Sequence, residues 1–360
     1  MIDPSNPHPR FHQLYLQLRE RIVSGEFAPL QPIPSQQQLQ ASYRVSLITV
    51  RRALERLTAE GYITREHGRG CFVTPEGSWL TNRRRTTQIG MVVSSIPNSF
   101  FPEIISGVES FLAGRDANLV IAHSRWLAAV EQRQIGHFLD QGCDGLIISP
   151  SQTLQDYLAL TAAGIPFVLI NHYYPRPEFS YVVTDDRDGA RQAGLHLVGH
   201  GHRRIGAIIG GRGKQTALER EEGFASALHD AGANLDEAWV IRPETFTYEE
   251  GERGMRELLA RHPDLTAVFC SSEILALGAA GGSLASGYAI PRDISLVAFG
   301  DSDTSRFFQV PLTTIHQPTQ EMGQRAMRLL WGLLQGEDGL EKAQRLPCRL
   351  VVRESTGPAR

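Results

Sequence analysis

The chain has 360 residues, of which 41% are hydrophobic and 21% charged, and its formal net charge is −3 at pH 7. This composition excludes an intrinsically disordered chain, and the length exceeds what one hydrophobic core usually supports, so we expect two or three domains. No apolar run approaches the roughly 20 residues of a membrane span, and the first residues, MIDPSNPHPRFHQLY, lack the apolar segment of a signal peptide. We therefore expect a cytoplasmic protein with no membrane partner.

The cysteines lie far apart, with neither the paired spacing of a disulfide framework nor a metal-binding pattern. They are Cys71, Cys143, Cys270 and Cys348. We expect them to be buried free thiols, as is usual in a reducing cytoplasm.

The net charge hides a difference between the two parts of the chain. Residues 1–85 contain 12 arginines against 7 acidic residues, a net charge of +5. The remainder contains 24 basic against 32 acidic residues, a net charge of −8. A small basic N-terminal part on a large acidic body indicates a polyanionic partner for that part.

The first predicted elements are two helices separated by a proline-rich segment. Apolar residues at positions 14, 18 and 22 predict a first helix that ends near Gly25. The segment FAPLQPIPS interrupts the chain. Ser35 followed by Gln38 forms the pattern of a capping box, which predicts the start of a second helix through Leu39 and Tyr43.

A third helix and a hairpin follow. Ser46 can cap the third helix, Gly61 can end it, and its buried stripe is formed by Val50, Ala53, Leu54 and Leu57. The segments YITRE and CFVT flank HGRG, which predicts a two-stranded hairpin. This order of elements predicts a winged helix-turn-helix, an α+β DNA-binding domain.

The third helix carries two adjacent arginines near its N-terminal end. Arg51 and Arg52 point away from the apolar stripe, and with Ser46 and Thr49 they can reach phosphates and base edges in a major groove. The predicted hairpin adds a second basic tip at residues 67–69. We expect double-stranded operator DNA as the partner.

Residues 10–74 resemble the GntR-type winged-helix domain. The resemblance runs through IPSQQQL, VSLITVRRALERLTAEGYI and HGRGCFV. It implies that DNA-contacting positions are occupied by Ser35, Gln37, Ser46, Thr49, Arg51, His67, Gly68 and Arg69.

The sequence departs from the family pattern at two places. Leu47 stands where an arginine usually follows the serine, and PLQPIPS lacks the usual Pro-Gly turn. Arg52 or Arg44 can compensate for the lost arginine, or Leu47 can touch a thymine methyl group. The operator sequence is therefore not predictable.

After a predicted linker at residues 77–87, short apolar strands alternate with amphipathic helices such as Phe101–Ala113 and Glu249–Arg261. The strand candidates are IGMVVSS, NLVIAHS, GLIISP, FVLIN, YVVTD, RIGAIIGG, AVFCSS and SLVAFGD. This alternation predicts parallel, doubly wound α/β sheets, and the length predicts two lobes. Ligands of such sheets bind beyond the carboxyl ends of the strands.

The body resembles the LacI-type sensor domain, which shares its fold with periplasmic sugar-binding proteins. The phrases that carry the resemblance include IGMVVSSIPNSFFPEIISGVE, CDGLIISP, GHRRIGAIIG, IPRDISLVAFGD and PLTTIHQP. Together with the GntR-type resemblance, which places a DNA-binding domain at 8–76, it implies a sensor at 88–356 whose chain crosses between lobes near Asp186, His316 and Pro347. Lobe 1 would comprise about 88–186 and 317–345, and lobe 2 about 187–316 and 346–356.

The resemblance also implies a ligand pocket built from aromatic, charged and hydroxyl side chains. An arginine and a carboxylate can grip adjacent hydroxyl groups of a sugar while an aromatic face covers its apolar carbons. Ser272 departs from the amide that some sugar-binding members carry. The implied effector-binding residues are Phe100, Phe101, Tyr173, Asp185, Lys214, Thr216, Arg220, Phe246, Ser272, Glu273, Asp301 and Gln317.

Other motifs do not point to catalysis. The histidines of GHGHRR lack a third ligand at suitable spacing for a metal. GRGKQT lacks the first glycine and the Ser/Thr of a phosphate loop, and GGSLASG fails the serine-elbow pattern. We expect no metal, no cofactor and no catalytic residue.

The combination of the two domains resembles the arabinose-type transcriptional repressors of bacteria. We expect a homodimeric, ligand-responsive repressor that a small polar effector, such as a sugar, releases from its operator. The alternative is a small-molecule-binding protein or enzyme with a vestigial winged-helix domain, which only Leu47 supports.

Overall fold

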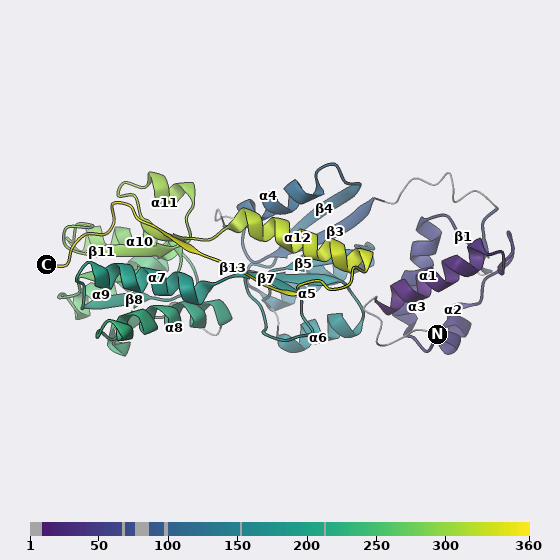
Figure 1. Cartoon of the computed structure of the whole chain (residues 1–360), viewed down its shortest axis with the longest axis horizontal. Coiled ribbons are helices and arrows are strands. Elements are labelled where there is room, and N and C mark those ends of the chain that lie inside the picture. Colours follow the sequence, from purple (N-terminus) through teal and green to yellow (C-terminus); the bar gives the residue numbers. More distant parts are fainter. Residues whose placement is uncertain (1–8, 67–68, 76–85, 97–99, 152, 212–213) are drawn as a thin grey trace.

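The computed structural model describes residues 9–66, 69–75, 86–96, 100–151, 153–211 and 214–360. Three bodies follow one another along the long axis of the molecule (Figure 1). The winged-helix domain is at one end, a first lobe lies in the middle, and a second lobe with the C-terminus is at the other end. Among the described residues, no helix is long and apolar enough to cross a membrane.

The N-terminal domain contains three helices and a two-stranded antiparallel sheet, which confirms the predicted winged helix-turn-helix. Its elements are α1 (Arg10–Val23), α2 (Gln36–Tyr43), α3 (Leu47–Ala59), β1 (Ile63–Glu66) and β2 (Gly70–Val73). Apolar residues of all three helices and both strands form one core. Figure 1 shows this domain apart from the sheets of the two lobes.

Local sequence signals account for these helix boundaries. The Ser35 side chain accepts from the backbone of Gln38, and the Gln38 side chain accepts from the Ser35 backbone, which confirms the capping box. Ser46 accepts from Thr49 N at 3.2 Å and caps α3. Where the family turn is missing, Leu30 takes the left-handed conformation (φ 64°). That conformation is unusual for a non-glycine residue.

The first lobe is a six-stranded parallel sheet in the order β13-β7-β6-β5-β3-β4. Helices α4 and α12 pack on one face, and α5 and α6 on the other. The strands are β3 (Thr87–Val93), β4 (Ala117–His123), β5 (Gly145–Ile148), β6 (Phe167–Ile170), β7 (Tyr181–Thr184) and β13 (Ala343–Leu346). The helices are α4 (Phe100–Leu112), α5 (Ala128–Asp140), α6 (Leu154–Ala162) and α12 (Thr319–Gln335).

The second lobe has the sheet order β14-β12-β11-β10-β8-β9, in which only β14 is antiparallel to its neighbour. The strands are β8 (Ile205–Ile208), β9 (Val240–Ile241), β10 (Ala267–Cys270), β11 (Ser295–Phe299), β12 (Thr313–His316) and β14 (Arg349–Val351). The helices are α7 (Asp186–Gly199), α8 (Gln215–Asp230), the 3-10 helix η2 (Glu237–Trp239), α9 (Tyr248–Arg261), α10 (Glu273–Ala285) and α11 (Asp303–Phe307).

Each sheet of this predicted α/β architecture is covered on both faces. In the second lobe, α7 and α8 cover one face, and α9 and α10 cover the other. The chain passes between the lobes after β7, after β12 and after β13. Because all three connections lie between the sheets, the carboxyl ends of strands from both lobes face a common space.

The four cysteines are free thiols, as predicted. Cys143, Cys270 and Cys348 are buried, and burial raises the pKa of Cys270 and Cys348. The prediction of burial is wrong for Cys71, which is only partly buried because it lies on the small two-stranded sheet.

Candidate functional site

Most of the predicted DNA-contacting side chains of the winged-helix domain are exposed. Those that are exposed there are Ser35, Gln37, Arg44, Ser46, Arg51 and Arg69. They lie at the start and end of α2, in the turn before α3, on α3 itself and just before β2, so the domain presents hydroxyl, amide and guanidinium groups to solvent. His67 and Gly68 lie outside the described residues.

Two predicted DNA-contacting residues do not share this exposed surface. Thr49 is buried, and its hydroxyl lies 2.8 Å from the hydroxyl of Ser46. Arg52 is turned toward the first lobe, where its Nη2 donates to the carbonyl of Cys143 at 3.3 Å, and its guanidinium lies 5.0 Å from the ring centroid of Phe11. Successive helical residues are about 100° apart, which carries Arg52 away from the face of Arg51.

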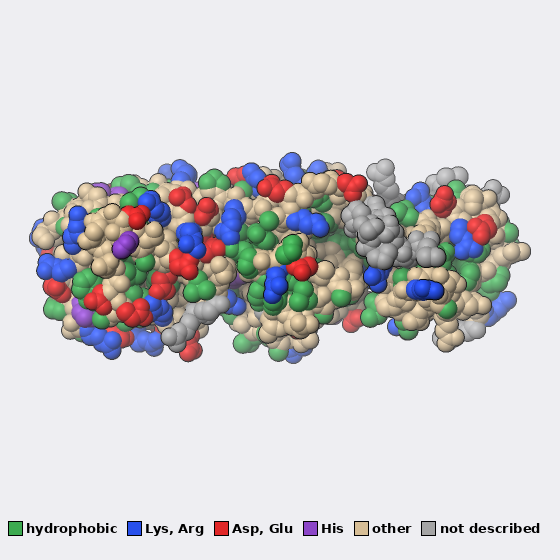
Figure 2. All heavy atoms as spheres, turned by 60° about the horizontal axis from the view of Figure 1, so that its bottom comes forward, with side chains coloured by type: hydrophobic (Ala, Val, Ile, Leu, Met, Phe, Trp, Pro, Cys, Tyr) green, Lys and Arg blue, Asp and Glu red, His purple; other side chains and the backbone are tan. Residues whose placement is uncertain are grey.

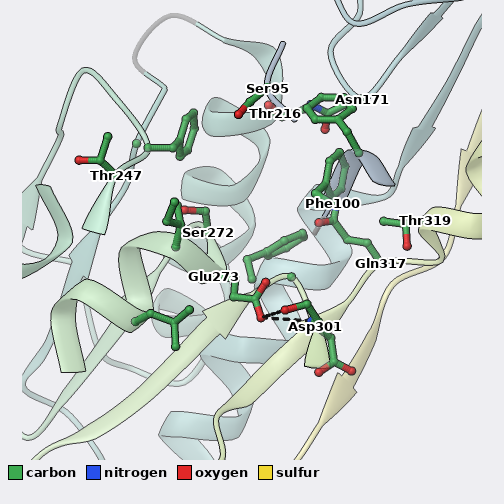
Figure 3. Close-up of a pocket in the computed structure, with 18 of the residues that line it drawn as sticks. Ser95, Phe100, Asn171, Thr216, Thr247, Ser272, Glu273, Asp301, Gln317 and Thr319 are labelled. Carbon is green, nitrogen blue, oxygen red and sulfur yellow. Dashed lines mark hydrogen bonds between the residues drawn. The ribbon is translucent and has the colours of Figure 1, made fainter. Parts of the chain in front are cut away.

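The second candidate site is a cavity of about 460 Å³ between the two lobes. Figure 3 shows its labelled side chains coming from both lobes toward one space. Nine of the predicted effector-binding residues line the cavity: Phe100, Phe101, Thr216, Arg220, Phe246, Ser272, Glu273, Asp301 and Gln317. The cavity lies at the carboxyl ends of strands in both sheets, where parallel α/β sheets bind ligands.

Arg220 is the central cation of the cavity wall. It is buried, its Nη2 lies 3.1 Å from Asp186, and its Nη1 donates to the carbonyl of Ser271 at 2.6 Å. Its guanidinium stacks 3.9 Å from the ring centroid of Phe299. The ion pair between Arg220 of α8 and Asp186 of α7 is possible because the two helices touch at Gly223. A Cβ there would lie 2.0 Å from the Arg187 carbonyl oxygen. These contacts fix the guanidinium in the wall.

Two carboxylates of the cavity already have partners. Asp301 lies 2.6 Å from an Arg353 nitrogen and 3.4 Å from His316 Nδ1. Burial alone would raise the pKa of Asp301, but these two neighbours outweigh burial and lower it. Glu273 accepts from Ser302 and Ser305, and the dashed lines at Glu273 in Figure 3 mark hydrogen bonds of its carboxylate. Both carboxylates are therefore held in place by their partners.

His172 supplies an unpartnered polar atom. Its Nδ1 lies 2.8 Å from the Thr216 hydroxyl, while its Nε2 is buried and has no hydrogen-bond partner in the described part of the chain. Burial, together with Lys214 and Arg220, lowers the pKa of His172 to about 3. The cavity therefore contains a neutral imidazole, and buried polar atoms of this kind normally find a partner.

Trp126 and Phe246 form an aromatic wall that spans the lobes. Their ring centroids are 5.8 Å apart, and Trp126 also lies edge-to-face against His172 at 5.4 Å. Arg125 and Trp126 are consecutive left-handed residues (φ 54° and 61°), and Asn171 is also left-handed (φ 66°). Strained backbone of this kind concentrates at binding sites.

Three predicted effector-binding residues do not line the cavity. The Tyr173 hydroxyl donates to Glu219 at 2.5 Å and accepts from Arg345, so Tyr173 joins a contact between the lobes beside the cavity. Asp185 accepts from Asp188 N and caps α7. Lys214 precedes α8, and burial lowers its pKa.

Glu219 of the second lobe contacts Arg345 and Tyr173 of the first lobe. Arg345 of β13 lies 3.1 Å from Glu219 of α8. Burial raises the pKa of Glu219, but hydrogen bonds from Arg345 and Tyr173 outweigh burial and lower it. The ionised carboxylate thus holds α8 against the first lobe.

Several lining residues were not found by sequence reasoning: Ser95, Glu103, Trp126, Asn171, His172, Gly210, Tyr248, Phe299 and Thr319. Ser95, Asn171 and Gly210 each follow a strand, and the rule that ligands bind beyond strand ends could have indicated them. Trp126 follows β4, but nothing in the sequence indicates that its ring turns across the cleft.

The low pKa of His172 predicts acid sensitivity. In the unfolded chain this histidine takes up a proton as the pH falls below about 6.5, whereas in the folded chain it does so only near pH 3. Protonation therefore favours the unfolded chain, and the free energy of unfolding decreases as the pH falls below about 6.5. Between pH 7.0 and 5.5 this side chain should lower the free energy of unfolding by about 1.3 kcal/mol. Urea titrations at both pH values measure this change. The drop in the free energy of unfolding from about pH 7.0 to about pH 5.5 should be smaller in His172→Asn than in wild type by this amount.

The matched control for this experiment is His137→Asn, because His137 is exposed on α5. This variant should retain the wild-type pH dependence. If the free energy of unfolding falls equally with pH in wild type and in His172→Asn, His172 is not held neutral in the folded protein.

Comparisons with known proteins fit both sites. The model of bacterial regulatory proteins of the gntR family matches residues 11–73, and that of the periplasmic binding protein-like domain matches residues 195–356. The transcriptional regulator CelR of Thermobifida fusca is 36% identical over 282 residues, which cover 76% of this chain and 82% of CelR. The chain belongs to the LacI family of transcription regulators.

Solved structures support the assignment. A complex of the regulator CelR with cellobiose has a TM-score of 0.68 and 32% identity, and the match covers 93% of this chain and 94% of that chain. A LacI family regulator from Enterococcus faecium with bound ribose has a TM-score of 0.67 and 29% identity over 76% of this chain and all of that one. The predicted family, with a GntR-type DNA-binding domain, and the prediction of a regulator rather than an enzyme are confirmed.

Proposed function

We propose that this regulator is a dimeric repressor that binds operator DNA through α3 and through Arg69 before β2, and that it is released when a small polar effector fills the cavity between its lobes. The observation that carries the proposal is the cavity itself, because its wall is shared by the two lobes. A ligand that touches both lobes favours the closed arrangement, and only such differential binding can shift a conformational equilibrium.

The cavity wall suits a polyhydroxylated ligand. Arg220 and Asp301 offer a fixed donor and a fixed acceptor, His172 Nε2 offers an unpartnered nitrogen, and Trp126 and Phe246 offer an apolar face. Such a set can grip hydroxyl groups while covering ring carbons. The cellobiose and ribose complexes of two relatives support a sugar, and the same groups would also suit a nucleoside.

Closure can reach the DNA through the first lobe. Arg52 of α3 contacts the Cys143 carbonyl before β5, so the winged-helix domain rests on that lobe. In a dimer, a movement of one lobe against the other changes the separation of the two recognition helices. Those helices must meet half-sites about 34 Å apart, or a multiple of that distance.

A two-stage experiment tests the proposal on the full-length protein. A thermal-shift screen with mono- and disaccharides and with nucleosides should reveal one selective stabiliser, since a ligand present at 100 times its Kd adds about 2.7 kcal/mol of stability. That compound should then lower the affinity for DNA from the regulator's own upstream region, measured by fluorescence anisotropy. A stabiliser that leaves DNA affinity unchanged would refute the coupling, and one that raises it would refute release.

A further inference from the structure

The recognition helix α3 begins with two exposed apolar side chains. Leu47 is 38% exposed and Ile48 is 62% exposed, although both lie in the most basic domain of the chain. They occupy the first two positions of the helix, directly after the capping serine. Neither belongs to the apolar core of the domain, which begins on this helix at Val50.

The two side chains flank the exposed face of α3 that carries Arg51. The buried stripe of α3 comprises Thr49, Val50, Ala53, Leu54 and Leu57. At 100° per residue, Arg51 falls between the two: Leu47 borders the buried stripe, and Ile48 lies on the face opposite it. The first turn and a half of α3 therefore presents an apolar pair with a guanidinium between them.

We propose that Leu47 and Ile48 form an apolar contact surface for thymine methyl groups, so that each operator half-site has a required thymine opposite the start of α3. The proposal rests on the proposed function, in which α3 enters the major groove. In that groove thymine alone presents a methyl group, whereas other base edges there present donors and acceptors.

An apolar side chain fits an apolar methyl group better than it fits a polar base edge. An apolar side chain placed against a guanine or cytosine edge excludes water from polar atoms without replacing their hydrogen bonds, and such atoms are costly to leave unsatisfied. Against a thymine methyl the same side chain buries apolar surface on both partners. The +5 net charge of residues 1–85, with Arg51 between the two side chains, makes the neighbouring partner a polyanion rather than an apolar protein surface.

The test begins with the site that the protein itself selects. Full-length protein is used to select duplexes from a random library, and each thymine of the selected duplex is then replaced in turn by deoxyuridine, which removes only the 5-methyl group. At one or two positions per half-site the replacement should weaken binding about fourfold, the effect of one buried methyl group. Leu47→Ala and Ile48→Ala should each weaken binding and abolish the sensitivity to deoxyuridine at one position.

Val23→Ala is the matched control, because Val23 is 59% exposed at the end of α1 in the same domain. It should retain both affinity and sensitivity. Leu47→Arg should move the preference at its position from thymine to guanine, which arginine binds in a bidentate manner. This gain of a new preference cannot result from misfolding.

The outcomes separate the two proposals. The thymine contact is overturned if no replacement of thymine by deoxyuridine weakens binding. It is also overturned if Leu47→Ala loses as much affinity as wild type on each replacement. Operator binding stands in both cases. Failure of the full-length protein to enrich any sequence overturns both proposals.

Discussion

Arg220→Ala should lower the free energy of unfolding of the sensor by about 3–5 kcal/mol, because it leaves the buried carboxylate of Asp186 without its ion-pair partner. It should also weaken effector binding roughly 10- to 150-fold, since a hydrogen bond from a charged group contributes about 1.5–3 kcal/mol. Urea denaturation followed by fluorescence measures the first effect, and calorimetric titration with the effector from the thermal-shift screen measures the second.

The same two helices provide the control. Arg187 of α7 pairs with Glu222 of α8, as Asp186 of α7 pairs with Arg220 of α8, but the side chains of Arg187 and Glu222 are 59% and 53% exposed. Arg187→Ala should therefore cost less than about 1 kcal/mol. Arg220→Lys keeps the charge but loses the planar fork, so it should remain folded while still losing effector affinity. An Arg220→Lys variant that binds the effector within about twofold of wild type would remove Arg220 from the site.

The fold of the N-terminal domain was predictable from local signals. The capping box at Ser35, the cap at Ser46 and Gly61 in its left-handed conformation each follow from two or three neighbouring residues. The alternating strands and helices of the body were equally clear, because buried parallel strands read as continuous apolar runs. Strands β9, β12, β13 and β14 were not predicted as strands. β9 has only two residues, and β13 and β14 have polar residues at exposed positions.

The cavity was predictable only in part, for a physical reason. Arg220 and Asp301 follow from the family resemblance, and the structure brings both to the cavity wall. Trp126 and Asn171 also line the cavity, and each has a left-handed backbone that is unusual for a non-glycine residue. The unpartnered Nε2 of His172 likewise depends on which atoms surround it after folding. No pattern of neighbouring residues contains that information.

The exposed face of α3 shows the same limit in the other domain. Arg51 and Arg52 are adjacent in sequence and looked equivalent, yet Arg51 is exposed and Arg52 contacts the first lobe. Figure 2 shows arginine and lysine side chains scattered over all three bodies, so charge alone does not mark the DNA-binding face. Helical phase and the position of the neighbouring lobe distinguish these two arginines.

Arg51→Ala should therefore weaken operator binding by about 5- to 150-fold, the range expected when a bidentate arginine–guanine contact is lost. If Arg51 contacts a phosphate instead, the loss should be uniform across sequences, and the slope of log affinity against log salt concentration should fall by about one. Fluorescence anisotropy with specific and random duplexes at several salt concentrations distinguishes these two roles.

Arg133→Ala is the control for charge, because Arg133 is an exposed arginine on α5 of the first lobe. It should change the affinity by less than twofold. Because the two sites share no residue, Arg51→Ala should bind the effector as wild type does. For the same reason, Arg220→Lys should bind DNA as wild type does when no effector is present. If Arg51→Ala binds the operator as wild type does, α3 is not the element that recognises it. The wing and the start of α2 would then carry recognition.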